Sequence, residues 1–587
     1  MEANNQTPES SAAQLPASSA PASAPMAATG AAQQPEQSDV KPSSDQSVDA
    51  TKPRGGRRSR KDRGRDLGRN AWSRQNIDKR ARNAEEQEAK RRKLEDGEEV
   101  PIPIYATQFS KEEIDADQRK PKKKVAVLIG YSGSGYHGMQ MTTNEKTIES
   151  DLFTAFVAAG AISKANAADP KKSSLVRCAR TDKGVHAAGN VVSLKLIVED
   201  PDVVEKINSH LSPQIRVWGY EVTNKSFSCY QQCDSRIYEY LIPSHCFLPP
   251  HPSTILGKKI VELAEKHNDM EAYLSRQEEV AHFWEETDNT YIKPLLKTFP
   301  EDIRRKVQAS LLIDTANDEP SDAATGEAAS ISEEIKTFDD AIKAVRAKYL
   351  EAKKAYRIHP KRMERVNEAL GMFVGTKNFH NYTIQKQFRD PSAKRHIKSF
   401  KISRDPIIIN GSEWLSLKVH GQSFMMHQIR KLVAMAAMMV RCGGDLRRIE
   451  ESYGDVKIAI PKAPGLGLLL ERPIFDSYNR KAPEMDVPRN PIDFSKYEKQ
   501  MDEFKQREIY ERIFREAEET NGFSNFFNHI DSFQDDAFLY VTSGGVDVVT
   551  TRPGVPFKGK QKTGKAALAE VECESDGEIV NDGEEGG

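Results

Sequence analysis

One carboxylate in this chain stands in a setting typical of a reactive acid. Asp182 lies between Arg180 and Lys183 in the segment RTDKGVHA (180–187). An alternating apolar run follows at 191–198 and predicts a half-buried strand. Residues that do chemistry often lie on loops that a rigid sheet positions. An ordinary solvated turn has the same composition, so this motif alone does not distinguish a catalytic Asp182 from a structural one.

A second charged group, far away in the sequence, could hold this acid in its ionised form. The stretch 426–442 is apolar nearly all round and predicts a buried helix, with Arg430 in its first turns. A buried guanidinium needs a carboxylate partner, because an unpaired buried charge strongly destabilises a protein. A bidentate pair with Asp182 would orient the carboxylate and lower its pKa. The alternative is that Arg430 points to solvent from the helix end.

A short strand could supply aromatic groups to the same site. The segment 236–242 predicts a strand in which Arg236, Tyr238 and Tyr240 project from one face. Either tyrosine, taken alone, could be an ordinary strand aromatic packed in a core. The neighbouring Arg236 indicates that this face is not wholly apolar.

The segment at 180–187 and several others resemble, in order, the motifs of the TruA family of tRNA pseudouridine synthases in its eukaryotic, fungal-type form. The others are YSGSGYHGMQ (131–140), SRIYEY (235–240), FMMHQIRK (424–431) and PGLGLLL (464–470). Together they are far more specific than any one of them. The resemblance extends from about Lys122 to Arg472 and leaves both ends of the chain uncovered.

This resemblance implies a division of chemical roles. Asp182 would be the catalytic carboxylate, which either adds to the ribose or removes a proton from it, and the sequence leaves both routes open. Tyr238 would stack on the uracil and could assist the late deprotonation. Arg430 would be the ion-pair partner of Asp182.

The resemblance also implies contacts with RNA. Arg180 would enter the base stack as the target nucleotide swings out. Leu468 would line the base pocket, with its neighbour Leu469 as an alternative. An isomerisation needs no redox carrier, so no cofactor is expected. The expected partners are tRNA and other structured RNAs, but the modified positions cannot be read from one sequence.

The strands and intervening helices predict an α+β fold with two α/β sub-domains of mixed or antiparallel sheet, and the resemblance implies a central RNA-binding cleft between them. The insert 251–360 is expected to be helical, except for an acidic disordered loop from Asp314 to Glu334. A long helix is expected from Phe494 to Glu519, laid on the body. The expected order is a disordered basic region (1–118), two sub-domains (119–233 and 234–480), a helical extension (481–540) and a disordered acidic tail (541–587).

The basic character of the chain is concentrated near its start. From Lys52 to Lys93 there are 17 basic and 6 acidic residues, whereas the whole chain has a net charge of −1. Such runs favour nuclear import or contact with nucleic acid, although solvated charge runs are common. The sequence therefore predicts a nuclear protein that meets the import machinery through this region.

The cysteines follow no paired pattern, which predicts free thiols in a reducing compartment. Cys229, Cys233, His245 and Cys246 lie close together in the sequence and raise the question of zinc. If the first two shared a strand they would be about 13 Å apart, too far for one ion. The longest apolar run, Leu432 to Val440, is too short to span a bilayer, so no membrane association is expected.

Overall fold

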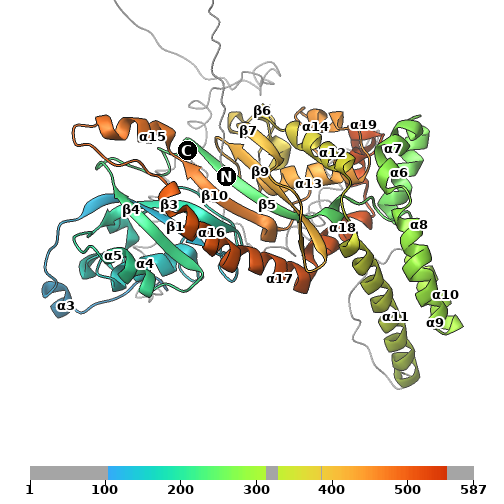
Figure 1. Ribbon diagram of the computed structural model, residues 1–587, viewed down its shortest axis with the longest axis horizontal. Helices are drawn as coiled ribbons and strands as arrows, with labels where there is room; N and C mark the ends of the chain where they lie inside the picture. Colours follow the sequence, from blue (N-terminus) through green and yellow to red (C-terminus); the bar gives the residue numbers. More distant parts are fainter. Residues whose placement is uncertain (1–102, 313–327, 385, 551–587) are drawn as a thin grey trace, which may run out of the picture. The chain divides into compact units, whose positions relative to one another are not determined.

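All the strands of the described residues lie in one sheet (Figure 1). The computed structural model describes residues 103–312, 328–384 and 386–550. Its strands form a 10-stranded sheet in the order β4-β1-β3-β10-β5-β9-β7-β6, with β2 beside β3 and β8 beside β9. Every pair of neighbouring strands among the described residues is antiparallel except β10 with β3. The strands are β1 (Lys123–Tyr131), β2 (Val176–Arg177), β3 (His186–Leu196), β4 (Ile215–Val222), β5 (Ser235–Pro243), β6 (Gly375–Asn378), β7 (Lys394–Ile402), β8 (Ile407–Ile409), β9 (Ser412–Gly421) and β10 (Leu468–Ile474).

The predicted α+β class is confirmed, and β10 joins the strands of the two expected halves into one continuous sheet. In the first half the helices are α3 (Lys111–Asp115), α4 (Ile148–Ala158) and α5 (Val203–Ser209). The second half contains α12 (Pro360–Gly371), α13 (Gln428–Arg441), α14 (Arg447–Glu451) and α15 (Asp476–Lys481). The C-terminal part contains α16 (Glu498–Phe504), α17 (Glu511–Thr520), α18 (Gly522–Asp531) and α19 (Gly545–Thr550).

Strand β3 is buried more deeply than its sequence predicts. The expected half-buried strand is buried along its whole length except at Lys195. Its polar side chains have hydrogen-bond partners inside the protein. The side-chain amide of Asn190 donates to the Ala179 carbonyl oxygen at 3.1 Å, and the hydroxyl of Ser193 accepts from the backbone amide of Cys229 at 3.2 Å. An alternating pattern therefore does not imply a solvated face, because hydrogen bonds satisfy the buried polar groups.

The insert is helical, as expected, and contains α6 (Ile255–Lys266), α7 (Met270–Gln277), α8 (Phe283–Thr287), α9 (Lys293–Thr298), α10 (Glu301–Leu312) and α11 (Ala328–Ala355). It has a small core of its own, formed by Ile292, Leu296, Ile303, Val307, Ala341 and Val345. The disordered loop expected at 314–334 is wrong in its last part, because residues 328–334 form the start of α11. Alanine and glutamate in this segment favour a helix. Residues 314–327 lie outside the described residues.

The regions expected to be disordered at the two ends of the chain, 1–118 and 541–587, each include residues that are packed on the body. Within the region expected to be disordered at 1–118, the Tyr105 ring packs edge-on against Phe153, with ring centroids 6.3 Å apart. Within the tail expected from 541, Val541 is fully buried and α19 follows. Apolar side chains that bury area on the body offset the entropy lost in ordering these segments. Residues 1–102 and 551–587 lie outside the described residues.

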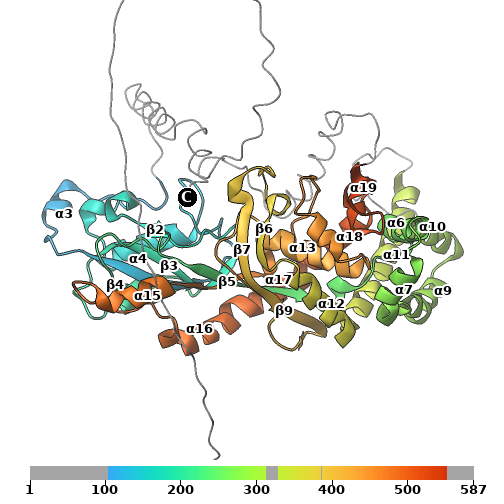
Figure 2. The ribbon, with the colours of Figure 1, turned by 90° about the horizontal axis from the view of Figure 1, so that it is seen from above.

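The expected C-terminal helix crosses one face of the sheet (Figures 1 and 2). It consists of α16, a π-helical stretch at Lys505–Tyr510, and α17. Its Tyr510 hydroxyl donates to Glu239 of β5, and the Ser416 hydroxyl of β9 donates to the same carboxylate. Figure 2 shows α16 and α13 on opposite sides of the sheet. One face of β5 is therefore used to hold this helix, and the other face is left for α13 and the loops around it.

A buried ion pair fastens α18 to α13. The guanidinium of Arg441 donates to both carboxylate oxygens of Asp531, and each side chain is only 6% exposed. We expect Asp531→Ala to lower the free energy of unfolding by about 3–5 kcal/mol, because it leaves a buried cation without its partner. Urea unfolding would measure this. The double variant Arg441→Met/Asp531→Leu should recover most of the loss, and a loss below about 1 kcal/mol for Asp531→Ala would contradict the assignment.

Candidate active site

The loop that carries Asp182 is held in place by the glycine-rich segment that follows β1. The Met139 amide donates to the Thr181 carbonyl oxygen at 3.1 Å. The Val185 amide donates to the Asp182 carbonyl oxygen at 3.1 Å, and this bond closes the turn. Gly138 has a φ of +86°, and a Cβ there would lie 2.9 Å from the Thr181 carbonyl oxygen. The glycine thus allows the two loops to touch, which fixes the backbone of Asp182 just before β3.

The carboxylate of Asp182 is hydrogen-bonded to a histidine. Nδ1 of His427 lies 2.9 Å from Oδ2 of Asp182, with the side chains 6% and 24% exposed. Burial raises the pKa of Asp182, but the hydrogen bond from His427 and the positive charges of His427, Arg430 and Lys462 outweigh it. The pKa therefore lies below its ordinary value. Asp182 is ionised at neutral pH, and it remains open to solvent on one side.

Arg430 occupies the first turn of α13 and is fully buried. Its Nε donates to the Ala463 carbonyl oxygen at 2.6 Å, and a Cβ on Gly465 would lie 3.4 Å from the guanidinium carbon. The alternative in which Arg430 points to solvent is therefore wrong. The structure brings Arg430 close enough to Asp182 for its charge to lower the pKa of that carboxyl.

Tyr238 lies on the face of β5 opposite to the C-terminal helix. It pairs in register with Leu470 of β10 and Val419 of β9, and its ring packs edge-on against Phe424 with centroids 5.4 Å apart. The residue is 8% exposed, and burial raises the pKa of its phenol. Tyr238 therefore remains a neutral phenol at physiological pH.

The two neighbours of Tyr238 on this face have structural partners. Tyr240 donates to the Pro464 carbonyl oxygen at 2.7 Å, and Arg236 donates to the Cys178 carbonyl oxygen at 2.7 Å. The first contact ties β5 to the segment that precedes β10. The second ties β5 to the segment that leads into the Asp182 loop. Both residues therefore help to position the site.

The sheet register separates the two leucine candidates. Leu468 pairs with Tyr240, and Leu469 pairs with Glu239. Directly opposed residues in an antiparallel pair project from the same face. Leu468 is thus on the Tyr238 face and 7% exposed, whereas Leu469 is fully buried on the other face. The structure thus places Leu468, and not Leu469, on the face of Tyr238.

Arg180 is exposed, two residues before Asp182. Its charge acts on the buried carboxylate of Glu149, which also receives a 2.5 Å hydrogen bond from Arg177. The side chain therefore lies at the surface of the Asp182 loop, where it can reach a bound molecule.

Sequence reasoning missed His427, although a signal was present. His427 and Arg430 are three residues apart at the start of a helix, which places their side chains on one side of its first turn. What the sequence does not reveal is the backbone of His427, the N-cap of α13, which has a φ of +57°. A non-glycine residue in this region is uncommon, and such residues cluster at functional sites.

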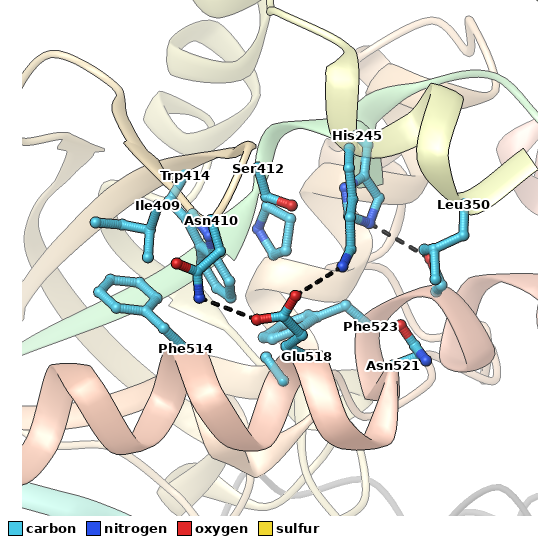
Figure 3. Close-up of a pocket in the computed structure, with 14 residues that line it drawn as sticks. His245, Leu350, Ile409, Asn410, Ser412, Trp414, Phe514, Glu518, Asn521 and Phe523 are labelled. Carbon is cyan, nitrogen blue, oxygen red and sulfur yellow. Dashed lines mark hydrogen bonds and ion pairs between the residues drawn. The ribbon is translucent and has the colours of Figure 1, made fainter. Parts of the chain in front are cut away.

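A small cavity that does not include the Asp182 loop is too small for a nucleobase. It has a volume of about 40 Å³ and lies where α11, β9 and α17 meet (Figure 3). The carboxylate of Glu518 lines this cavity and accepts hydrogen bonds from Lys354 at 3.1 Å and from Asn410 at 2.9 Å. None of its lining residues belongs to the group around Asp182. A cavity of this volume holds a few water molecules, and we assign it no function.

Cys229 and Cys233 lie in the loop between β4 and β5, not on one strand, and burial together with the nearby Cys233 thiol raises the pKa of Cys229. Cys229 Sγ donates to the Val176 carbonyl oxygen at 3.2 Å, and Cys233 Sγ donates to the Ser235 carbonyl oxygen at 3.3 Å. His245 instead lies 3.4 Å from the hydroxyl of Ser524. Within the described ranges, no group of three or more histidine, cysteine or acidic side chains is arranged to hold a metal ion. In the same part of the chain, no helix is long and apolar enough to cross a bilayer.

Comparison with known proteins decides the family. A family model described as tRNA pseudouridine synthase matches residues 369–476. The tRNA pseudouridine synthase 1 of Yarrowia lipolytica is 42% identical over 80% of this chain and 85% of its own length. That of Schizosaccharomyces pombe is also 42% identical, over 79% of this chain and 92% of its own. The chain belongs to the tRNA pseudouridine synthase family. The enzyme is also 34% identical to the tRNA pseudouridine(27/28) synthase of Saccharomyces cerevisiae, over 68% of this chain and 97% of that one.

Proposed function

We propose that this enzyme converts uridines in tRNA to pseudouridine, with Asp182 as the group that acts on the ribose. The observation that carries this proposal is the setting of Asp182: a partly exposed carboxylate that receives a hydrogen bond from His427 and is kept charged by Arg430 and Lys462. An ionised carboxylate can add to an electron-poor carbon or accept a proton. Family membership selects the uridine ribose as its target.

The reaction breaks the bond between N1 of uracil and C1′ of ribose and forms a bond between C5 and C1′. In one route Asp182 adds to C1′ as uracil leaves, and the rotated base displaces it. In the other, Asp182 takes a proton from C2′ to give a glycal and later returns it. In both, the proton on C5 is lost and N1 gains one. Either route requires Asp182 to be ionised, which its surroundings favour.

Tyr238 and Leu468 would hold the uracil during this rotation. Both lie on the same face of the sheet, next to the Asp182 loop, and both retain a little exposed surface. Because burial raises the pKa of Tyr238, its neutral phenol would be a poor base. This favours stacking over proton removal as its main role. Arg180, exposed on the loop, would fill the space that the flipped nucleotide leaves.

The first test is Asp182→Asn, which removes the charge and preserves the shape. We expect pseudouridine formation in tRNA to fall by about a thousandfold or more, because neither route proceeds without the carboxylate. Single-turnover assays with carbodiimide mapping measure the product, and a filter-binding assay measures tRNA affinity in parallel. Affinity should stay within a few-fold of wild type. Full turnover in Asp182→Asn would refute the role, and lost affinity with lost turnover would indicate a folding defect.

The second test concerns His427, whose hydrogen bond helps to keep the pKa of Asp182 low. Activity should decline as pH falls through this pKa, since the protonated acid is inactive. Removing the donor raises the pKa, so the acid limb of the pH–rate profile should move to higher pH in His427→Gly. Glycine accepts the +57° φ without strain.

His427→Asn is the matched control for that variant. Its side-chain amide can donate from nearly the same place as Nδ1, and asparagine tolerates the left-handed region. The acid limb in His427→Asn should lie close to that of wild type. An acid limb that stays in place in His427→Gly would show that the hydrogen bond does not tune Asp182.

We further propose that the enzyme acts in the nucleus and on structured RNAs besides tRNA. The basic run at 52–93 supports the nuclear location. Recognition of structured RNA by its shape does not depend on the base sequence, which supports substrates besides tRNA. Deleting 1–102 should abolish nuclear accumulation of a fluorescent fusion while tRNA turnover persists, because the packed segment from 103 onward is retained. Unchanged nuclear accumulation would contradict this. Pseudouridine mapping of total RNA, with and without the protein, would identify the substrates.

A further inference from the structure

The hairpin of β6 and β7, together with the loop between them, is strongly basic. Residues 375–398 contain six basic residues and one acidic residue in a chain whose net charge is −1. The acidic one, Asp390, is buried and pairs with Lys386 at 3.3 Å. The basic residues are Lys377, Lys386, Arg389, Lys394, Arg395 and Lys398. β6 ends the order of strands, so the hairpin is an edge of the sheet (Figure 1).

The sheet register places part of this charge on one face. Lys377 and Arg395 are directly opposed in the β6–β7 pair, so both project from the same face. Lys377 lies over the ring of Tyr453, 5.6 Å from its centroid. Lys457, on the segment after α14, donates to the His380 carbonyl oxygen at 3.0 Å and adds an exposed cation beside the hairpin.

The hairpin is fastened to the candidate active site. The Thr383 hydroxyl donates to the Met426 carbonyl oxygen at 3.0 Å, and Met426 directly precedes His427. The large apolar side chains of Phe388 and Met426 are exposed in this region, at 41% and 40%. The Phe388 ring is supported edge-on by His380, with centroids 5.4 Å apart. The hairpin thus combines cations with a supported, exposed aromatic ring.

We infer that the β6–β7 hairpin is an RNA-docking surface, on which Lys377, Arg389 and Arg395 bind phosphates flanking the target uridine and Phe388 stacks on an unpaired base. This inference rests on the proposed function and adds where the substrate is held. Cations that follow a backbone, with an aromatic ring between them, match single-stranded or looped RNA. An acidic protein would bind to the cations but would gain little from the ring of Phe388.

The test compares two triple variants of the full chain. In the first, Lys377, Arg389 and Arg395 are changed to Gln. In the second, three exposed lysines of the insert, Lys266, Lys297 and Lys343, are changed to Gln as a charge-matched control. Affinity for unmodified tRNA is measured by fluorescence anisotropy at several salt concentrations. Each lost phosphate contact reduces the slope of log K against log salt by about 0.7–0.9.

We expect the hairpin triple to lose about two to three units of slope and at least about tenfold in affinity at 0.15 M salt, and the insert triple to match wild type. The charge-keeping triple Lys377→Arg/Arg389→Lys/Arg395→Lys should restore the slope, which separates lost charge from a folding defect. Equal losses in the hairpin and insert triples, or no loss in the hairpin triple, would overturn the inference.

The aromatic component has a separate control. Phe388→Ala should weaken tRNA binding about tenfold, whereas Leu274→Ala, which removes a side chain 56% exposed on α7, should not. If Phe388→Ala has no effect and a polyglutamate peptide competes as well as tRNA, the surface binds acidic chains in general and the inference is wrong. These assays measure binding, whereas Asp182→Asn measures turnover. The docking inference can therefore be wrong while the proposed function is right, and the proposed function can be wrong while the docking inference is right.

Discussion

The charge on Asp182 is the constraint around which this structure is built. A carboxylate with three-quarters of its side chain covered would tend to take up a proton, because burial disfavours its charged form. Three cationic or hydrogen-bonding groups from two other parts of the chain oppose this: His427 and Arg430 at the start of α13, and Lys462 on the segment before β10. The acid is useful for chemistry only while these groups surround it.

The sheet assembles these parts by giving its two faces different tasks. In β5, Glu239 faces the C-terminal helix and binds the hydroxyls of Tyr510 and Ser416, whereas Tyr238 faces the side of Phe424 and the Asp182 loop. Strand alternation therefore assigns one residue to fastening the helix and the next to the site. The same alternation in β10 places Leu468 toward the site and Leu469 toward the helix.

Much of this organisation could be predicted from the sequence, where local patterns determine local structure. The apolar run and charged first turn of α13 and the strand containing Tyr238 follow from the periodicity of their sequences. The approach of Arg430 to Asp182 could be predicted because a buried guanidinium needs a partner.

The remaining features depend on tertiary contacts that no local pattern encodes. The left-handed backbone of His427 aims its ring at Asp182, and only the packed structure shows it. The burial of β3 depends on hydrogen bonds between Asn190, Ser193 and distant backbone groups. The choice between Leu468 and Leu469 depends on sheet register, which shifts every side chain to the other face when it slips by one residue.

The most direct test of the account is the ionisation of Asp182 itself. The full chain would be labelled with ¹³C at the aspartate carboxyl carbons, and the Asp182 resonance assigned by its absence in Asp182→Asn. The account predicts that this resonance titrates with a midpoint below 3.8, the ordinary pKa of an aspartate, because the surrounding groups lower the pKa of Asp182. A titration between pH 5 and 7 would show that burial outweighs the surrounding cations, and would contradict the central claim.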